Sequence, residues 1–344
     1  MKAARLHSYG GPLVVEEVPT PEPGDGQIVV KVEGAGFCHS DLHIIDGEVQ
    51  LLPAMPTILG HENAGVVAQV GRGVTEVKEG DNVAVYGGWG CGHCKACISG
   101  DEHLCIQPRW VGMFGYDGGY AEYLLVPNER YLVKLDRVPT REAAVLTDAA
   151  VTPYRAIKKA LPFLSPDRHV LVIGAGGVGQ FGIKLLKLLC ASPIIAVEID
   201  DAKMKAAREC GADEALDGRS PDIAEKILQL SGGIGVPVAL DFVGSDQTLA
   251  LALGMAATGG KVVQVGLAGG TANIQVMQNS RFEVQFEASF WGNLNELREV
   301  IALAECGRLT PVRLDYYPLD QINDVYRLLK EGKIPGRAVI TPSG

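Results

Sequence analysis

The sequence predicts an α/β protein with one strand-rich domain and one domain built on a parallel sheet. Its 344 residues correspond to about two domains of ordinary size. Residues 1–135 contain short β-branched runs separated by Gly and Pro, which is typical of strands and turns. From residue 170 onward, apolar strands alternate with amphipathic helices, a pattern that indicates a parallel sheet with helices on both faces.

The strand-rich part has five clear strand patterns before any helical repeat. They are IVVKVEGAG (28–36), NAGVVAQVG (63–71), DNVAVYGG (81–88), YAEYLLVP (120–127) and YLVKL (131–135). The first helical repeat is TREAAVLTDAAVTPYRAIKKAL at 140–161. We therefore expect a β-domain that ends in one helix-like segment.

The second part alternates regularly. Expected strands are VLVIG (170–174), IIAVEI (194–199), EALD (214–217), VALDFVG (238–244), KVVQVG (261–266) and VQFEASF (284–290), and expected helices lie at 177–190, 201–211, 222–230 and 248–257. Two further helices, at 293–307 and 320–333, precede a short strand at 337–341. Asp320 is the expected N-cap of the second of these helices.

Composition excludes several classes of partner. The net charge of −10 argues against a nucleic acid or an anionic membrane surface. No apolar run reaches the roughly 18 residues that a membrane-spanning helix needs. The first residues, MKAARLHSYGGPL, lack the apolar core of a signal peptide, so a cytoplasmic location is expected. In that compartment the eight cysteines are not expected to form disulfides.

A glycine-rich turn predicts a dinucleotide site. Gly174, Gly176, Gly177 and Gly179 lie in GAGGVG, a G-x-G-x-x-G sequence that follows an apolar strand and opens a helix. Backbone N–H groups and the helix N-terminus can then face a pyrophosphate. Glu198 ends the next strand, where a carboxylate accepts hydrogen bonds from ribose hydroxyls and repels a 2′-phosphate, so NAD is favoured over NADP.

A compact cysteine loop predicts a structural zinc site. The spacing C-x₂-C-x₂-C-x₇-C supplies four thiolates, from Cys91, Cys94, Cys97 and Cys105. A closed shell of four thiolates leaves no position for a substrate, which is typical of structural zinc. Cys190, Cys210 and Cys306 lie in helix-like apolar segments and are interpreted as small buried residues.

A second polar constellation is spread over two segments, CHSDLH (38–43) and GHE (60–62). Isolated histidines are commonly structural, and the residues alone leave structural and metal-binding interpretations equally open. A Cys, a His and a carboxylate together would make a three-ligand site with an open fourth position, as catalytic zinc requires.

These motifs resemble the zinc-dependent alcohol dehydrogenases of the medium-chain dehydrogenase/reductase superfamily. The segment GHENAGVVAQVGRGV (60–74) fits that family's zinc signature, and the cysteine loop and glycine turn follow in the family's order. The resemblance covers essentially the whole chain. It implies a GroES-like β-rich catalytic domain formed by residues 1–149 and 291–344, and a doubly wound, Rossmann-type NAD domain at 150–290.

The resemblance also implies the catalytic residues. Cys38, His61 and Asp148 match the ligands of the catalytic zinc, and Asp148 replaces the commoner cysteine, as in a bacterial subgroup that acts on secondary alcohols. Zinc lowers the pKa of the alcohol, and hydride passes to C4 of the nicotinamide. The remaining catalytic matches are Asp41 (orienting His61), Glu62 (approaching the metal when substrate is absent), Ser40 and His43 (passing the hydroxyl proton to solvent).

Coenzyme contacts are implied in the same way. The matched residues are His39 and Arg337 (pyrophosphate), Val178 (behind the nicotinamide), Lys203 (ribose), Thr152 (near the nicotinamide), and Val265, Ser289 and Trp291 (carboxamide).

The expected substrate is a small uncharged alcohol or ketone, because no Arg or Lys beside Cys38 or His61 is placed to hold an anion. Trp291 is the favoured apolar wall of the substrate pocket, and Trp110 and Tyr86 are weaker candidates. From the family we expect a homo-oligomer, a tetramer rather than a dimer.

Several alternatives stay open. Within the superfamily these are a polyol or glutathione-adduct dehydrogenase and a zinc-free enone or quinone reductase. Outside it, a non-enzymatic zinc module could use the cysteine loop for docking. Two zinc ions per chain would favour the dehydrogenase, and one would favour either the reductase or the module. The natural alcohol and the stereospecificity are not encoded in any motif identified above.

Overall fold

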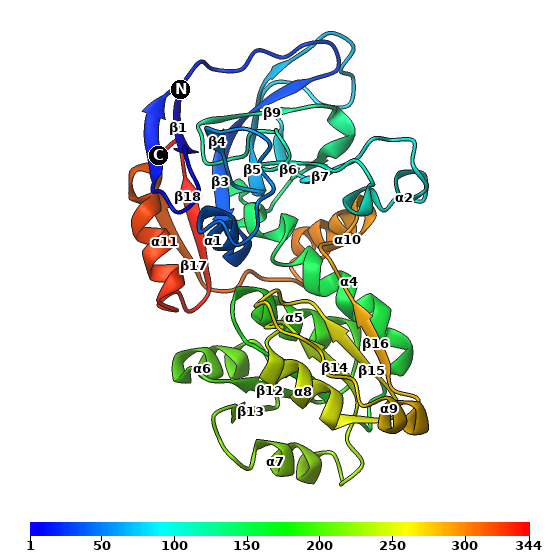
Figure 1. The fold of residues 1–344 in the computed structure, drawn as a ribbon. Coiled ribbons are helices and arrows are strands. Elements are labelled where there is room, and N and C mark those ends of the chain that lie inside the picture. The colour runs from blue at the N-terminus through cyan, green and yellow to red at the C-terminus, as the bar shows by residue number, and fades with distance from the viewer. The chain divides into compact units, whose positions relative to one another are not determined.

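The computed structural model describes residues 1–344, except for the side chains of residues 278 and 279. It divides into two compact units, labelled in Figure 1 by their elements. Unit 1 comprises Met1–Val151 and Gly292–Gly344, and unit 2 comprises Thr152–Trp291. No helix in the described part of the chain has both the length and the apolar character needed to cross a membrane.

Unit 1 is built mainly from strands, as the sequence predicts. A three-stranded sheet has the order β2 (Leu13–Glu17), β1 (Lys2–Leu6), β4 (Thr57–Ile58). The seven-stranded sheet has the order β10 (Leu132–Lys134), β6 (Asn82–Val85), β5 (Glu62–Val70), β3 (Ile28–Phe37), β18 (Arg337–Thr341), β17 (Leu314–Pro318), with β9 (Tyr123–Val126) also paired to β3. A small pair is formed by β7 (Gly88–Trp89) and β8 (Arg109–Trp110). All five strands expected before residue 140 are present.

The last strand of the chain completes this sheet. β18 pairs antiparallel with β3 through Ala338 and Phe37, and parallel with β17. Strand β3 therefore receives hydrogen bonds from segments about 270 residues apart in sequence, Glu62–Val70 and Arg337–Thr341. Both termini lie in this unit (Figure 1).

Short helices connect the strands of unit 1. They are α1 (His39–Ile45), α2 (Lys95–Ile98), α3 (Thr140–Ala143), α10 (Leu294–Glu305) and α11 (Ile322–Lys330), with 3₁₀ turns η1 (Glu102–Leu104), η2 (Glu129–Tyr131), η3 (Ala144–Thr147) and η5 (Leu319–Gln321). The expectation for Asp320 is wrong. It lies inside η5, and Gln321 is the N-cap of α11, because an extra 3₁₀ turn precedes that helix.

The helical repeat expected at 140–161 is interrupted. α3 passes into η3, which ends at Thr147, and α4 (Val151–Ala160) begins anew. Asp148 lies in the break with φ −138° and ψ −62°, outside helical geometry. The Thr147 hydroxyl donates to the Ala144 carbonyl at 2.7 Å, a local bond that competes with helix continuation. Pro153 falls in the first turn of α4, where its missing N–H costs nothing.

Unit 2 is a six-stranded sheet in which every pair is parallel. Its order is β13 (Glu214–Asp217), β12 (Ile194–Glu198), β11 (Val170–Ile173), β14 (Val236–Asp241), β15 (Ala256–Gln264), β16 (Gln285–Ala288). The expected sixth strand, VQFEASF, is confirmed as β16. Leu171, Ile195, Ala239 and Val262 lie in the core of this unit.

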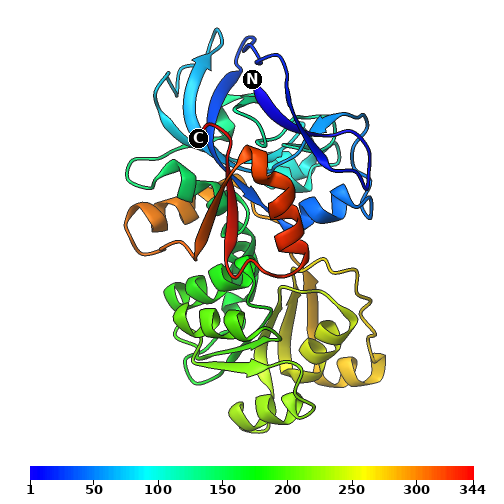
Figure 2. The ribbon, with the colours of Figure 1, turned by 90° about the vertical axis from the view of Figure 1, so that its left-hand side faces the viewer.

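Helices cover both faces of this sheet (Figure 2). α5 (Gly177–Leu189) packs with α6 (Asp201–Glu209), and α7 (Ile223–Leu230) packs with α8 (Asp246–Met255). The turn η4 (Leu161–Phe163) and helix α9 (Val276–Phe282) complete the unit, and α9 was not predicted from the sequence. Strand order reverses between β11 and β14, which places the ligand crevice of such a sheet at their carboxyl ends.

Candidate catalytic and structural metal centres

Three neighbouring strands of unit 1 assemble the first centre. Gly36 on β3 pairs with Glu62 on β5, and Phe37 on β3 pairs with Ala338 on β18. The ends of these strands therefore lie side by side. Cys38 directly follows β3 and His61 directly precedes β5, so strand register alone brings these two distant side chains together.

The break after η3 brings the carboxylate to the same place. Asp148 Oδ2 lies 3.6 Å from Cys38 Sγ and 3.4 Å from His61 Nε2. Ligand atoms of these three residues and of Glu62 all lie within 4.8 Å of one another. A continuous helix through residue 148 would not have given this backbone geometry. The interruption is thus part of how the site forms.

These distances fit zinc. With typical Zn–S, Zn–N and Zn–O lengths, tetrahedral coordination separates a thiolate from a carboxylate oxygen by about 3.6 Å and an imidazole nitrogen from that oxygen by about 3.4 Å. Asp148 meets both values with Cys38 and His61. Three such ligands leave the fourth position open, as in catalytic zinc sites.

Glu62 is held differently. Arg337, the first residue of β18, donates from Nε to Glu62 Oε2 at 3.2 Å and from Nη2 to Oε1. Both side chains are buried. Gly36 makes room for this carboxylate, since a Cβ there would lie 1.9 Å from Glu62 Oε2. The pairing of Glu62 with Arg337 was not predicted, and nothing in the local sequence of either residue points to the other.

Electrostatics favour the ionised thiol. Burial acts to raise the pKa of Cys38, but the Arg337 charge and His61 act against it, and the pKa lies below its ordinary value. Burial likewise acts to lower the pKa of His61, but the Asp41 charge and the contact with Asp148 outweigh it and raise the pKa well above its usual range. Arg337 Nη2 also lies 3.8 Å from Asp148 Oδ2. The site is thus a cluster of coupled charges.

Helix α1 positions three further predicted residues. Asp41 Oδ1 lies 3.3 Å from His61 Nδ1, the ring nitrogen opposite the one near Asp148. Ser40 Oγ lies 3.4 Å from His61 Nε2, so it is next to the ligand atoms. His43 Nδ1 contacts Glu48 Oε2 at 2.5 Å. Glu48 was not predicted as a site residue, although it follows His43 closely in the chain.

The second centre is the cysteine loop. Sγ–Sγ distances are 3.5 Å for Cys94–Cys97, 3.8 Å for Cys94–Cys105 and 3.9 Å for Cys91–Cys97. Two sulfurs bound to one tetrahedral zinc lie about 3.8 Å apart. The predicted four residues therefore form a closed cage of the right size, and their ligand atoms all lie within 4.8 Å.

The thiols of this cage differ in acidity. Backbone N–H groups of Cys97 and Ile106 lower the pKa of Cys94 to about 6. Burial raises the pKa of Cys97 to about 12. Metal ligation requires the thiolate, so a bound dication would hold all four sulfurs ionised.

In unit 2 the glycine turn fits a pyrophosphate. Gly174 has φ +87°, and a Cβ there would lie 2.6 Å from Val243 Cγ2. A Cβ on Gly179 would lie 2.0 Å from the Gly174 carbonyl oxygen, so both glycines are needed for packing. A Cβ on Gly176 would meet nothing within 4 Å, which leaves open space in front of the backbone at the N-terminus of α5.

Glu198 lies where it was expected, at the carboxyl end of β12. Its Oε2 accepts from the Ala175 N–H at 2.8 Å and its Oε1 from the Ile199 N–H at 2.7 Å. The carboxylate therefore adjoins the glycine turn and carries its charge beside it. A 2′-phosphate at this position would meet that charge.

The remaining coenzyme candidates lie on both units. Val265 N–H donates to Asp241 O and Ser289 N–H donates to Gln264 O, which places both residues at the carboxyl edge of the unit 2 sheet. In the same unit Thr152 is buried in α4, and Trp291 is buried with φ +46°. Three candidates are half-buried: Gly177 and Val178 in the first turn of α5, and Lys203 in the first turn of α6. In unit 1 His39 is exposed at the start of α1.

Tyr86, a weaker candidate for the pocket wall, lies in the interior of unit 1. It is fully buried, and its hydroxyl donates to the Gly292 carbonyl at 2.9 Å. Trp110 is half-buried and makes an edge contact with Phe114.

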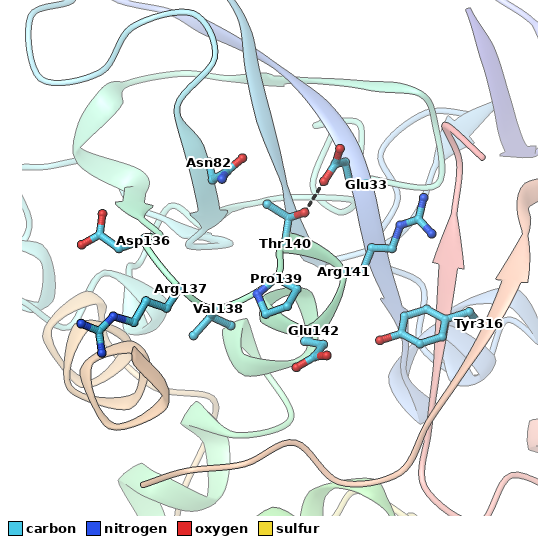
Figure 3. A pocket seen from close by; sticks show the side chains of 10 residues that line it. All are labelled: Glu33, Asn82, Asp136, Arg137, Val138, Pro139, Thr140, Arg141, Glu142 and Tyr316. Atoms are coloured by element: carbon cyan, nitrogen blue, oxygen red, sulfur yellow. Dashed lines mark hydrogen bonds between the residues drawn. The ribbon is translucent and has the colours of Figure 1, made fainter. Parts of the chain in front are cut away.

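Unit 1 also has a surface hollow of about 530 Å³, and none of its lining residues is a candidate metal ligand (Figure 3). It is lined by Glu33, Asn82, Asp136, Arg137, Val138, Pro139, Thr140, Arg141, Glu142 and Tyr316. The Thr140 hydroxyl donates to Glu33 within it. Charges of both signs are mixed around the hollow, with no cluster of one sign, so it does not define a site.

Comparison with known proteins agrees with both units. Residues 24–137 match the alcohol dehydrogenase GroES-like domain, and residues 177–305 match the zinc-binding dehydrogenase domain. The NAD-dependent alcohol dehydrogenase of Sulfurisphaera tokodaii is 38% identical, covering 99% of this chain and 100% of its own. D-arabinose 1-dehydrogenase (NADP⁺) of Saccharolobus solfataricus is 36% identical, covering 99% of this chain and 97% of its own.

Among solved structures, the alcohol dehydrogenase of Aeropyrum pernix superimposes with a TM-score of 0.94 at 38% identity. The match covers 99% of this chain and 100% of that one. A full-length relationship at this identity goes beyond a shared fold. Together with the two matched domains and the two metal centres, it shows that the chain belongs to the family of zinc-binding alcohol dehydrogenases.

Proposed function

We propose that this protein is a zinc-dependent alcohol dehydrogenase that transfers hydride reversibly between a small uncharged alcohol and NAD. The observation that carries the proposal is the meeting of Cys38, His61 and Asp148 at zinc-ligand separations. The same chain has a glycine turn with open space at its helix N-terminus and an acid beside it. Metal and coenzyme sites in one chain are what this redox chemistry needs.

Cys38, His61 and Asp148 would hold the zinc, which would supply a Lewis acid that lowers the pKa of the alcohol. Ser40, whose Oγ lies 3.4 Å from His61 Nε2, accepts the hydroxyl proton. His43, with about one quarter of its side chain exposed, passes that proton to solvent while its Nδ1 contacts Glu48. An imidazole suits this step because its ring nitrogens can accept a proton and release one.

Unit 2 binds the coenzyme in this proposal. The N-terminus of α5 holds the pyrophosphate, and Glu198 accepts hydrogen bonds from the ribose hydroxyls. The rest of NAD is contacted by Thr152, Val178, Lys203, Val265, Ser289 and Trp291. From unit 1, His39 contributes to pyrophosphate binding, whereas Arg337, also predicted as a pyrophosphate contact, is buried in its pair with Glu62. The catalytic domain comprises residues 1–149 and 291–344, and the coenzyme domain residues 150–290, close to the two compact units.

The substrate is a secondary alcohol or its ketone. Asp148 in the ligand set supports this choice through its resemblance to secondary-alcohol enzymes. The cluster contains one guanidinium, Arg337, and Glu62 neutralises it. A substrate carboxylate or phosphate would therefore lack a cationic partner there.

A sugar or polyol is the second candidate, because the arabinose dehydrogenase relative is 36% identical over the full chain. A panel of primary, secondary and polyol alcohols with NAD, followed by NADH absorbance, decides between them. The highest kcat/KM is expected for a secondary alcohol. Highest turnover with a polyol would select the second candidate, and no turnover of any alcohol by zinc-replete protein would refute the dehydrogenase assignment.

We further propose a homo-oligomer, a tetramer rather than a dimer, working in the cytoplasm. β16 is an edge strand whose Phe286 side chain is exposed, and Val276 and Met277 on α9 are exposed in the same unit. Such an edge with apolar side chains is suited to pairing with another copy. Sedimentation equilibrium gives the mass directly, and a monomer of about 36.5 kDa at micromolar concentration would contradict the proposal. The cage of reduced thiolates suits the reducing cytoplasm.

A further inference from the structure

The polar contacts behind His61 continue beyond Asp41. Asp41 Oδ1 lies 3.3 Å from His61 Nδ1, and Asp41 Oδ2 accepts from the Tyr120 hydroxyl at 2.7 Å. The backbone N–H of Cys38 donates to the same Oδ2 at 3.0 Å. Asp41 is thus fixed on one side by Tyr120 and Cys38 and faces His61 on the other.

The whole chain of contacts is out of solvent. Tyr120 is 0% exposed, Asp41 1% and His61 3%. Burial and the Asp41 charge raise the pKa of Tyr120 well above its ordinary value, so the hydroxyl remains a proton donor. A buried carboxylate needs such donors because water is not there to solvate it.

The Tyr120 ring is placed without help from its hydroxyl. Backbone bonds from Gly118, Gly119 and Tyr120 to the segment Ile58–Gly60 hold it beside the residue that precedes His61. Its ring stacks on Phe37 with centroids 5.2 Å apart. Gly60 lacks a side chain at the contact, where a Cβ would lie 2.7 Å from the ring. Phenylalanine would keep all of these contacts and lose only the hydroxyl.

We propose that Tyr120 is a positioning residue for the catalytic metal, acting through Asp41 to hold the His61 imidazole toward the centre formed with Cys38 and Asp148. This inference rests on the proposed zinc chemistry of that centre. Without the hydroxyl, Asp41 Oδ2 keeps the Cys38 N–H as its donor, and the carboxylate turns toward other donors. This change loosens its contact with His61. Partners of a zinc-bound imidazole affect metal affinity in this way.

The test uses the holoenzyme carrying two zinc ions per chain. Zinc transfer to a chromogenic chelator is followed for wild type and Tyr120→Phe. One zinc should leave about three- to tenfold faster in the variant, less than the roughly 10- to 100-fold effect of changing a direct partner of a ligand. The zinc of the cysteine cage serves as an internal reference and should leave at the wild-type rate.

Tyr326→Phe is the matched control. Its hydroxyl also donates to a carboxylate, Asp46 Oδ1 at 2.5 Å, in the same unit but not beside a metal ligand. Both zinc ions should leave this variant at wild-type rates. The affinity for NAD should be unchanged in both tyrosine variants.

A double-mutant cycle separates positioning from packing. Tyr120→Phe should have no further effect on zinc release in an Asp41→Asn background, because the proposed route runs through that carboxylate. Additive effects, equal acceleration of both zinc ions, or wild-type release by Tyr120→Phe would each overturn the inference. Wild type that binds only the cage zinc would instead refute the proposed catalytic centre, so the two failures are distinguishable.

Discussion

Arg337 and Glu62 form a two-point ion pair in the interior of unit 1, with side chains 4% and 0% exposed. The guanidinium comes from the first residue of β18 and the carboxylate from the first residue of β5, on strands that both flank β3. This pair neutralises a cation that would otherwise lie beside Cys38 and Asp148. It therefore sets the charge balance of the candidate catalytic centre.

Glu62→Gln should lower the free energy of unfolding by about 3–5 kcal/mol, because one buried charge then lacks its partner. Urea unfolding of the metal-replete protein measures this loss. Asp25→Asn is the control, since the Asp25–Arg72 pair is largely exposed and contributes about 1 kcal/mol or less. A loss for Glu62→Gln as small as that of the control would show that Arg337 is solvated after all.

Chelation should separate the two centres. A centre with three ligands and an open position exchanges its metal more readily than a closed cage of four thiolates. Elemental analysis should give two zinc ions per chain, and a chelator should abolish activity before circular dichroism detects unfolding. Loss of activity only together with unfolding, or one zinc per chain, would contradict the two-centre assignment.

Asp148→Asn should weaken the catalytic zinc strongly and leave NAD binding nearly intact. The amide keeps the shape of the side chain but removes the charge that helps to bind a dication. Zinc content after dialysis and NAD titration by fluorescence provide the two measurements. Asp320→Asn, an exposed carboxylate in the same unit, should retain both zinc ions. Full zinc and full kcat in Asp148→Asn would transfer the ligand role to another carboxylate, Glu62 being the nearest.

NAD should be preferred over NADP by at least about tenfold in kcat/KM, since Glu198 would repel a 2′-phosphate. Glu198→Ala should reduce this preference. Asp217→Ala is the matched control, because Asp217 pairs in register with Glu198 at the end of the next strand but binds Arg219. An unchanged preference in Glu198→Ala would place the selecting residue elsewhere.

Trp291→Ala should raise kcat/KM for bulky aryl ketones relative to acetone, because removing the indole from the apolar wall enlarges the pocket. Steady-state rates with both ketones provide the ratio, and NAD affinity is measured in parallel. An unchanged ratio with weakened NAD binding would assign Trp291 to the coenzyme site alone.

Much of this protein could be predicted from local sequence. Period-two runs and apolar strands alternating with helices predict both kinds of sheet, because burial of a strand face leaves a regular pattern. The cysteine cage and the glycine turn are equally local, since all their groups lie within 15 and six consecutive residues. Two predictions were wrong: Asp320 as a helix N-cap, and one uninterrupted helix-like segment at 140–161. They failed because an added 3₁₀ turn and a broken helix leave no strong periodic signal in the sequence.

The catalytic centre depends on tertiary structure. Its residues are spread over 300 positions of the sequence: Cys38, His61, Asp148 and Arg337. They meet because β5 and β18 both pair with β3, and because the helical geometry is interrupted at Asp148. The family resemblance suggested the three ligands, but the pairing of Arg337 with Glu62 and of Tyr120 with Asp41 became visible only in three dimensions. Local propensity and periodicity act over one or two turns of chain, whereas strand register and buried charge pairing join residues that have no relation along it.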